Sequence, residues 1–440
     1  MKSPKNRIQM YPKGSNSSQA PASRPAAGAC VEQWLQWLEA IHPTEIDLGL
    51  DRVLVVLRRL FPRKPNARII TIAGTNGKGT TVATLERILL AAGRRTGAYT
   101  SPHLQRYNER VRLDGQDIDD AALVNAFEKV EAARRGISLT YFEFGTLAAF
   151  VAFAEAGVED WILEVGLGGR LDAVNVLDAD YAIITAIDID HIGFLGDNRN
   201  VIGFEKAGIL RPGITAVCAD PQPPESVLQQ AVAQKVNLQL TGRDYQFHRA
   251  DEDASDVELL VGEERITLPA GPLPLESVGA AVVLARELVP EMSAGSLTEA
   301  VQSVYLPGRF EQVAANPRVL VDVGHNPHAA SWLAGRLSRC HSGRGVLRGV
   351  YAALADKDIA GVVSAMAPVV EHWYFAGLSV PRGLAAEDLR ERSLKAGVEE
   401  GETFLTVADA LAAALRHAGP EDTIIVFGSF YTVAEARALC

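Results

Sequence analysis

The sequence predicts an α/β protein with a larger N-terminal domain, built on a mainly parallel sheet, and a smaller α/β domain at the C-terminus. Three observations support this prediction. Short apolar runs alternate with helical stretches over most of the 440 residues, which is the pattern of parallel βαβ units. One run leads into a glycine-rich turn that contains a lysine, at residues 71–81. The alternation also starts again after a segment containing Pro and Gly at 305–312.

The composition is that of an ordinary globular protein. Hydrophobic residues make up 48% and charged residues 22% of the chain, and the formal net charge is −11. We therefore expect no binding to nucleic acid, and an anionic ligand would need locally placed basic groups or metal ions. The longest apolar run, residues 144–154, is too short to span a membrane and predicts a buried helix. Because no apolar signal segment follows the first basic residues and the four cysteines are scattered, we expect a cytoplasmic protein.

The first half of the chain is expected to fold in the following order. Residues 1–29, rich in Pro, Ser, Ala and Gly, are predicted to be a disordered tail. A helix from Val31 should stop before His42-Pro43, since the residue before a proline avoids the helical region, and a second helix is expected over 48–60. Strands are expected at 68–74, 96–100, 160–166, 181–188 and 214–219.

The second half begins with a polar, hairpin-like stretch at 243–272 and a hinge at 305–312. Beyond the hinge, the runs RVLVDVG, GVLRGVYAAL, HWYFAG and TIIVFG predict a second parallel sheet. We therefore expect one domain over 30–304 and a smaller, Rossmann-like α/β domain over 313–440.

The stretch TIAGTNGKGTT, residues 71–81, has the chemistry of a phosphate-binding loop. Its three glycines let backbone amides approach an anion, and the helix that follows offers its positive N-terminal end. Lys78 would neutralise the β- and γ-phosphates, and Thr80 or Thr81 could face Mg²⁺. Only two residues separate Gly74 from the Gly-Lys pair, whereas the standard loop has four. A strand–helix turn with a surface lysine is the alternative, but the compact run of glycines favours a P-loop ATPase domain.

Charged side chains also follow a neighbouring strand. Glu164 lies near the end of the strand at 160–166, and Arg170 and Asp172 come soon after it. Open α/β sheets bind ligands at the carboxyl ends of their strands, and a carboxylate near a phosphate loop suits Mg²⁺. A structural ion pair between Glu164 and Arg170 is the alternative.

The next strand ends in Asp188, Asp190 and His191, and Lys206 lies among apolar residues of the following helix. A lone histidine is more often structural than a ligand, but His191 is expected at the same sheet edge as Glu164. The residues alone fit two interpretations of Lys206 equally well: a lysine of the site, or a helix lysine that extends its ammonium to solvent.

Polar residues follow the strand at 318–322 in the C-terminal part as well. Asp322 is a candidate for a ribose or catalytic contact, and His325 and Asn326 come just after it. His328 is the weaker candidate of the two histidines and is expected at the surface near a helix start.

In this order the motifs resemble the Mur ligase superfamily, and within it the bacterial dihydrofolate synthase/folylpolyglutamate synthase family. The resemblance spans about residues 31–440. The shortened loop is the superfamily's form, and Gly79 marks the folate branch. The other matching segments are SPHL (101–104), NERVRLDG (108–115), TYFEFGTL (140–147), EVGLGGRLDA (164–173), DHIGFLG (190–196), EKAGI (205–209), LPGRFE (306–311), DVGHNP (322–327), ADKD (355–358) and FGSFYTV (427–433).

The resemblance implies that ATP and two Mg²⁺ ions bind to this chain. Lys206 matches a lysine that the family carries as a carbamate, which helps to organise the second ion, and His325 is a candidate general base. Ser277 stands where the family has an asparagine, so its shorter hydroxyl would reach ATP only through water. The implied metal ligands are Ser101, Glu164 and His191, and the implied ATP contacts are Thr75, Asn76, Gly77, Lys78, Gly79, Thr80, Ser277, Arg309 and Asp322.

Three further segments match those that bind dihydropteroate in the family. The implied reaction joins L-glutamate to dihydropteroate and to reduced folates, with ATP, through an acyl phosphate, and we expect a monomer. The motif IDLGL at 46–50 favours the dihydrofolate synthase activity. The matching residues are Asp47, Leu48, Gly49, Leu50, Thr140, Tyr141, Phe142, Glu143, Leu171, Asp172 and Ala173.

Two other functions fit parts of the pattern. A peptidoglycan ligase of the Mur type would add an amino acid to a UDP-linked acceptor, but residues 1–67 contain no evident UDP-binding domain. A nucleotide switch would use the phosphate loop for signalling, but no NKxD base-recognition motif is present, and the second α/β domain fits a ligase better.

Overall fold

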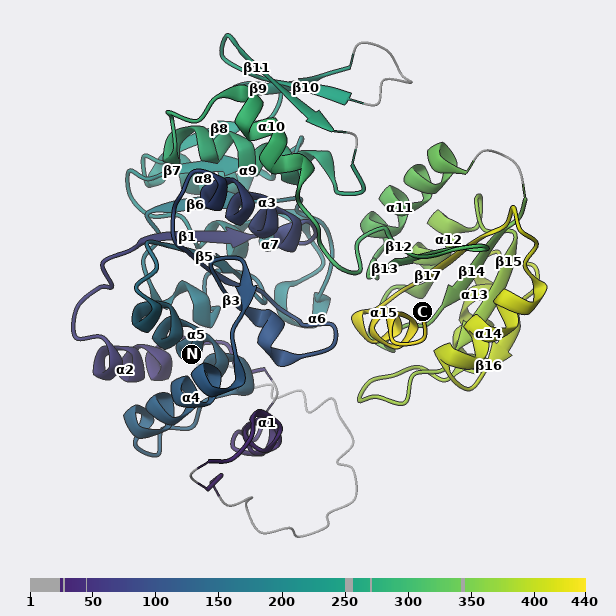
Figure 1. Ribbon diagram of the computed structural model, residues 1–440, viewed down its shortest axis with the longest axis horizontal. Coiled ribbons are helices and arrows are strands. Elements are labelled where there is room, and N and C mark those ends of the chain that lie inside the picture. The colour runs from purple at the N-terminus through teal and green to yellow at the C-terminus, as the bar shows by residue number, and fades with distance from the viewer. Residues whose placement is uncertain (1–23, 27, 45, 250–255, 270, 342–344) are drawn as a thin grey trace, which may run out of the picture.

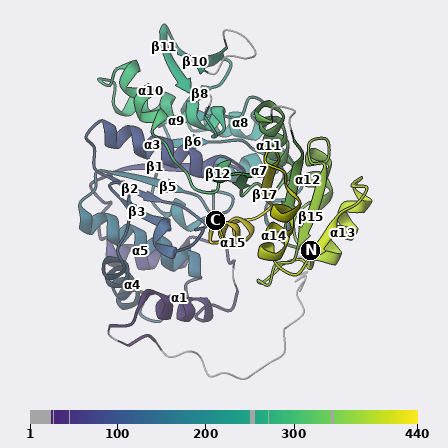
Figure 2. The ribbon, with the colours of Figure 1, turned by 45° about the vertical axis from the view of Figure 1, so that its right-hand side comes forward.

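The computed structural model describes residues 24–26, 28–44, 46–249, 256–269, 271–341 and 345–440. Most of the predicted tail at 1–29 lies outside these residues, as do 250–255 and 270 within the predicted hairpin stretch. A larger N-terminal part and a smaller C-terminal part lie side by side (Figures 1 and 2). The chain between α10 (Ala294–Gln302) and β12 (Glu311–Ala315) connects them. No helix in the described part of the chain is both long and apolar enough to cross a membrane.

The larger part is organised around an eight-stranded sheet. Six strands run parallel and the β3–β4 hairpin adds two antiparallel strands at one edge. β1 occupies the centre, between β5 and β6, so that the loops after these three strands open at one edge of the sheet. In spatial order the strands are β4 (Gln116–Asp117), β3 (Val111–Leu113), β2 (Thr96–Tyr99), β5 (Asp160–Glu164), β1 (Arg68–Ala73), β6 (Tyr181–Ile184), β7 (Thr215–Cys218) and β8 (Asn237–Leu240).

Helices cover both faces of this sheet, as parallel strands require. One face packs on α3 (Lys78–Ala91), α9 (Leu275–Leu288) and α10 (Ala294–Gln302). The other face packs on a helical layer formed by α1 (Val31–Ala40), α2 (Asp51–Leu60), α4 (Asp120–Arg134), α5 (Tyr141–Ala156), α7 (Arg199–Ala207) and α8 (Glu225–Ala233). The short helices are η1 (Tyr107–Arg110), η2 (Ala173–Val176) and α6 (Ile192–Leu195).

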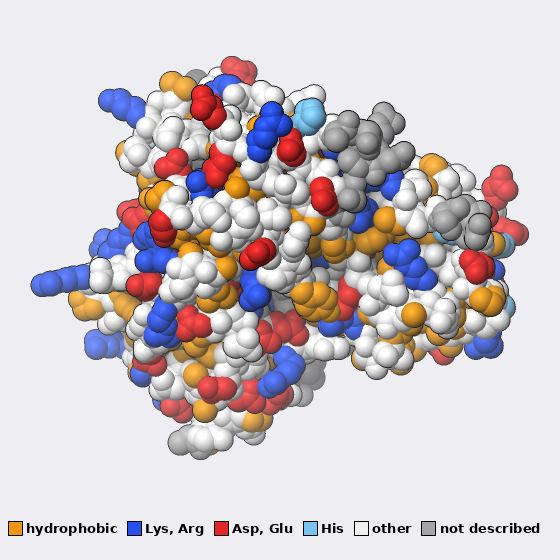
Figure 3. All heavy atoms as spheres, turned by 45° about the horizontal axis from the view of Figure 1, so that its top comes forward, with side chains coloured by type: hydrophobic (Ala, Val, Ile, Leu, Met, Phe, Trp, Pro, Cys, Tyr) orange, Lys and Arg blue, Asp and Glu red, His pale blue; other side chains and the backbone are white. Residues whose placement is uncertain are grey.

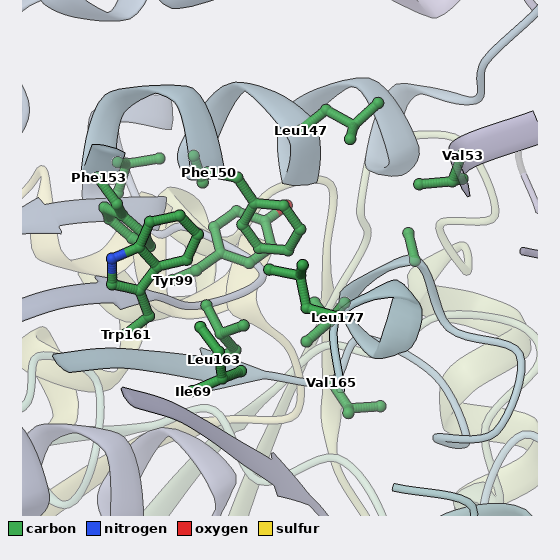
Figure 4. Close-up of a cluster of buried hydrophobic side chains, with 14 of the residues drawn as sticks. Val53, Ile69, Tyr99, Leu147, Phe150, Phe153, Trp161, Leu163, Val165 and Leu177 are labelled. Atoms are coloured by element: carbon green, nitrogen blue, oxygen red, sulfur yellow. The ribbon is translucent and has the colours of Figure 1, made fainter. Parts of the chain in front are cut away.

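The α5 helix is the predicted buried helix at 144–154. Phe150 and Phe153 point from α5 onto the sheet, where they meet Trp161 of β5 (Figure 4). All three rings are almost completely buried. This aromatic packing fixes α5 against β5, the strand that ends in Glu164.

A buried ion pair network secures the start of β1 and β5. Asp160 is fully buried and accepts hydrogen bonds from the Arg94 Nε at 2.7 Å and from the Arg68 Nη2 at 3.0 Å. We expect Asp160→Asn to lower the free energy of unfolding by about 3 kcal/mol, because it removes the buried charge that both arginines contact and leaves Arg94 only the exposed Glu159 at 3.6 Å. Urea unfolding followed by circular dichroism measures this change. A decrease in the free energy of unfolding below about 1 kcal/mol, the range of exposed ion pairs, would contradict this expectation. It would show that water already hydrogen-bonds both arginines.

A separate three-stranded sheet forms from the predicted hairpin stretch. β9 (Tyr245–His248), β10 (Asp256–Val261) and β11 (Glu264–Pro269) pair antiparallel. Its apolar face packs on α9 and α10.

The smaller part has a six-stranded sheet, parallel except for its first strand β12. Helices α11 (Pro327–Cys340), α12 (Ile359–Met366) and α13 (Ala386–Lys395) cover one face, and α14 (Val407–His417) and α15 (Phe430–Arg437) cover the other. The strands in spatial order are β12 (Glu311–Ala315), β13 (Arg318–Asp322), β17 (Thr423–Phe427), β14 (Leu347–Tyr351), β15 (His372–Ala376) and β16 (Glu402–Phe404).

The predicted strands and the α/β architecture are confirmed, with local corrections. The helix expected over 48–60 begins only at Asp51, and β12 already begins at Glu311, inside the predicted hinge. The sequence prediction missed five edge or near-edge strands: β3, β4, β8, β12 and β16. These strands are two to five residues long and partly exposed, so they lack the continuous apolar runs of the central strands.

Candidate active site

A cavity of about 550 Å³ lies at the edge of the large sheet where β1, β5 and β6 end. The N-terminal part contributes the phosphate loop, Glu164, His191 and Lys206, and the smaller part contributes residues 322–325 and the start of α11. Residues that are far apart in the sequence therefore line one space between the two parts. On the face that Figure 3 shows, acidic and basic side chains are interspersed, without a large field of one sign.

The phosphate loop has the geometry that its sequence predicts. Gly77 adopts a left-handed conformation (φ 88°) and caps α3, which begins at Lys78. The Lys78 Nζ donates hydrogen bonds to the carbonyl oxygens of Gly74 at 3.0 Å and Thr75 at 3.2 Å. Burial lowers the pKa of Lys78, and the nearby Glu164 opposes this shift. These two carbonyl contacts hold the ammonium under the loop.

Gly74 must be a glycine, because a Cβ atom there would lie 1.7 Å from the Thr185 Oγ1. We expect Gly74→Ala to push the loop away from β6 and weaken ADP binding about 10- to 100-fold, measured by calorimetry. Gly213→Ala is the matched control, since Gly213 also has a positive φ (75°) but open space around it. Equal affinities for Gly74→Ala and the control would contradict the steric argument.

Two polar side chains of the loop are already engaged within the protein. The Thr75 hydroxyl donates to the Asp188 carbonyl at 2.9 Å and accepts from the Asp188 amide at 3.0 Å. Asn76 exchanges two 3.0 Å hydrogen bonds with Asn326 of the smaller part. Asn76 can therefore offer an anion its backbone amide, whereas the Thr75 amide already donates to the Ala186 carbonyl at 2.7 Å. The predicted phosphate contact of Thr75 does not fit this geometry. The predicted residues Gly79, Thr80 and Ser277 also line the cavity, and the Ser277 Oγ lies against Gly77.

The three predicted metal ligands line the same cavity. Glu164 is buried, burial raises its pKa, and its Oε2 accepts from the Ser101 amide at 3.3 Å. Burial lowers the pKa of His191 to about 4, so its ring is neutral at pH 7 and free to bind a metal. Within the described residues, no three His, Cys, Asp or Glu side chains form a ready-made metal cluster. A carboxylate, a hydroxyl and a neutral imidazole suit a divalent cation that also takes phosphate oxygens.

Lys206 is buried in α7 and lines the cavity, so the interpretation as a lysine that reaches solvent is wrong. Burial lowers its pKa to about 7, with Lys78 adding repulsion. The alternative interpretation, an ion pair between Glu164 and Arg170, is wrong as well, because Arg170 pairs with Glu205 at 2.8 Å. Arg170 is therefore not the partner of Glu164, which lines the cavity.

The hinge and the smaller part place three predicted residues at the cavity. Arg309 stacks on the Phe430 ring, with its guanidinium carbon 4.9 Å from the ring centroid, and burial lowers its pKa. Asp322 is buried, and its two oxygens accept the amides of Phe310 and Gly324 at 2.8 and 2.7 Å. His325 bonds through Nδ1 to the Val323 carbonyl at 3.0 Å. Asp322 thus shapes the loop that presents His325.

The residues expected to hold dihydropteroate form a separate group on the α5 side of the sheet. Arg52 joins two of them: it bonds Asp47 at 2.6 Å and the Glu143 carboxylate at 2.8 Å. Thr140 and Glu143 also cap α5. Neither Leu48, Gly49, Leu50, Tyr141, Leu171 nor Ala173 lines the described cavity.

Two members of that group connect it to the cavity. A Cβ atom at Gly166, a cavity residue, would lie 2.7 Å from Phe142 and 3.3 Å from Asp172. Asp172 accepts the amides of Leu167 and Val174, and burial raises its pKa to about 7. The group therefore borders the cavity at Gly166.

The sequence prediction assigned no role to two residues that the structure brings together here. Lys357 reaches from the smaller part to Asp190 with an Nζ–Oδ1 distance of 2.8 Å. Burial raises the pKa of Asp190, but the His325 hydrogen bond and the Lys357 charge together hold it well below its usual range. Lys357 belongs to the ADKD segment, which matches a family motif. Because 167 residues separate Lys357 from Asp190, no local pattern in the sequence could pair them.

The fold and the cavity are those of a two-domain Mur ligase. Residues 72–240 match the family model described as the Mur ligase middle domain, and residues 308–430 match the model described as Mur ligase, glutamate ligase domain. The dihydrofolate synthase/folylpolyglutamate synthase of Escherichia coli strain K12 is 44% identical over 410 residues, or 93% of this chain and 95% of that protein.

Solved structures agree with these matches. Escherichia coli FolC in complex with DHPP and ADP is 43% identical, with a TM-score of 0.90 over 94% of this chain and 99% of that one. A folylpolyglutamate synthase/dihydrofolate synthase with Mn, AMPPNP and L-glutamate bound is 43% identical, with a TM-score of 0.87 over 94% of this chain and 99% of that one. The chain therefore belongs to the dihydrofolate synthase/folylpolyglutamate synthase family, as the motifs predict.

Proposed function

We propose that this protein is an ATP-dependent amide ligase that joins L-glutamate to dihydropteroate and, in polyglutamylation, to reduced folates. One observation carries the proposal. A phosphate loop of the short Mur type faces the glutamate ligase domain across a single cavity that also contains Glu164, His191 and Lys206. The relatives with ADP, AMPPNP, Mn, DHPP and L-glutamate support the same choice of ligands.

The chemistry requires activation of a carboxylate, which is a poor electrophile. The acceptor carboxylate attacks the γ-phosphorus of ATP, which gives an acyl phosphate and ADP. The amine of glutamate then attacks the acyl carbon, so that a C–N bond forms and phosphate leaves. Lys78 and the amides of residues 76–80 hold the phosphates and offset charge as it develops, which is the main source of catalysis in phosphoryl transfer.

A divalent cation held by Ser101, Glu164 and His191 would supply charge neutralisation at the transferred phosphoryl group. The same residues favour Mg²⁺ or Mn²⁺, because hydroxyl, carboxylate and imidazole leave room for phosphate oxygens. Two ions are proposed, the second beside Lys206.

Lys206 is proposed to carry a carbamate. Carbon dioxide reacts only with a neutral amine, and a pKa of about 7 leaves a large neutral fraction at physiological pH. The carbamate replaces a cation by an anion at a position where Lys78 already supplies positive charge. This exchange removes a repulsion between two buried lysines.

The remaining site residues have proposed roles that follow their positions. Arg309, which lies over the Phe430 ring, would contact ATP from the hinge. Asp322 would contact it from the second domain, and Ser277 would do so from α9. His325 is the proposed general base for the amine. Dihydropteroate would lie along 47–50, 140–143 and 171–173 and reach the cavity past Gly166.

Both halves of the cavity come from one chain, so we propose that a monomer in the cytoplasm is the active form. The four cysteines are all free thiols, which fits a reducing compartment.

A direct assay tests the proposed function. The protein is mixed with ATP, Mg²⁺, L-glutamate and dihydropteroate, and phosphate and dihydrofolate are measured together. Equal amounts of phosphate and amide product are expected, whereas a nucleotide switch would release phosphate without product. No product with dihydropteroate or with tetrahydrofolate would refute the proposal, and a comparison of the two rates would show which acceptor dominates.

A further inference from the structure

A single carboxylate of the large domain gathers three polar groups of the smaller domain. The Asp190 Oδ1 accepts the Lys357 ammonium at 2.8 Å, and its Oδ2 accepts the Asn326 amide at 3.1 Å and faces the His325 Nε2 at 3.6 Å. These three groups come from two segments, the start of α11 and the loop before α12. The Asp190 carboxylate therefore makes a direct contact between the two domains beside the cavity.

Asp190 is also tied to the residues on its own side. Its Oδ1 accepts the amide of His191 at 2.8 Å, and His191 has a left-handed backbone (φ 51°) that non-glycine residues rarely adopt. Asn326 continues the network by its two hydrogen bonds to Asn76 of the phosphate loop. The Asp190 carboxylate thus contacts the candidate metal ligand His191 and the candidate base His325 directly, and it reaches the phosphate loop through Asn326.

We infer that Asp190 is a positioning residue: it docks the glutamate ligase domain on the phosphate loop and sets His191 and His325 in place across the cavity. It acts through these neighbours and touches no reacting atom itself. The inference rests on the proposed function only for its activity readout.

The burial of the pair explains why the contact is specific to one arrangement of the domains. The Asp190 and Lys357 side chains are 11% and 8% exposed. A buried ammonium without its counter-charge is strongly unfavourable, so the domains cannot dock in this way unless Lys357 meets a carboxylate. In the described residues, Asp190 is the one carboxylate within 4 Å of Lys357. The pair therefore selects this docking geometry rather than adding general stability.

The test compares four variants of the full chain: Asp190→Asn, Lys357→Met, the double variant, and Asp422→Asn as a matched control. Asp422 pairs with Arg348 inside the smaller domain at 2.9 Å, with side chains 9% and 11% exposed, and does not line the cavity. Turnover of the proposed ligation, small-angle X-ray scattering without ligand and the melting temperature are measured for each.

We expect Asp190→Asn to reduce kcat about 100-fold, the effect of a misplacement of about 1 Å in a catalytic site. Its maximum dimension by scattering should exceed that of the natural protein, while its melting temperature changes little. The double variant should be no more than about threefold slower than the slower single variant, because both substitutions break one contact. Asp422→Asn should melt earlier yet keep the kcat of its folded fraction and the scattering curve of the natural protein.

Two results would overturn the inference. One is an Asp190→Asn protein whose activity falls only in step with its folded fraction, with unchanged scattering. The other is additivity of the two single effects in the double variant. A natural protein that forms no amide product would instead refute the proposed function, and the scattering comparison would still decide whether Asp190 docks the domains.

Discussion

Replacing Lys78 by alanine is expected to reduce turnover about 1,000-fold, the upper range for removal of one preorganised donor from a catalytic site. Lys78 lies in the phosphate loop, and its Nζ is held by the carbonyl oxygens of Gly74 and Thr75. Burial already lowers its pKa, so the folded protein gains little stability from the ammonium. The loss should therefore appear in turnover and not in folding.

Phosphate release under saturating substrates measures this effect, and circular dichroism with a melting curve verifies the fold. Lys64→Ala serves as the control, because Lys64 forms an exposed pair with Asp180 outside the cavity. A Lys78→Ala protein that folds and retains more than about a tenth of the activity would contradict the phosphate role, since a single lost donor costs at least 100-fold in such sites.

Replacing Lys206 by alanine is expected to reduce turnover about 100-fold, the scale of losing a group that supports a metal site. The activity should return in part when acetate or formate is added, since a small carboxylate can occupy the position of the carbamate. Sodium chloride at equal ionic strength is the control for the added salt. Undiminished turnover in Lys206→Ala would exclude the carbamate role.

The depressed pKa of Lys206 also predicts two pH effects. Activity should fall below pH 7, because the amine then protonates and no longer binds carbon dioxide. The second effect concerns stability in buffer without metal or carbon dioxide. Between about pH 7 and 10.5, the ordinary pKa of a lysine, Lys206 is protonated in the unfolded chain but neutral in the folded protein. The free energy of unfolding should therefore rise with pH across that window, and Lys206→Met should remove this slope.

The phosphate loop shows how much of the site a sequence can predict. The run from Gly74 to Thr81 carries its own geometry: glycines at the turn, a lysine at the first helical position and a helix that follows. Its odd spacing identifies the Mur type, and the comparisons confirm the family. Glu164 and His191 could be placed at the same edge because parallel strands end together there.

Other residues depend on the environment that the folded chain provides. The sequence left Lys206 undecided between solvent and cavity, and only its burial in α7 decides between them. Arg170 was a possible partner of Glu164, but α7 presents Glu205 to it instead. The short edge strands were missed because half-exposed segments carry weak hydrophobic patterns.

The sequence by itself determined the α/β class, the phosphate loop, the family and the proposed chemistry, because local motifs and apolar periodicity encode them along the chain. Only the tertiary structure decided how the two domains meet. Lys357, Asn326 and His325 reach Asp190 from positions more than 130 residues away, and such contacts depend on complementary charge and shape across an interface. Burial then lowers the pKa of Lys78 and Lys206 and raises that of Glu164, which no spacing in the sequence reveals.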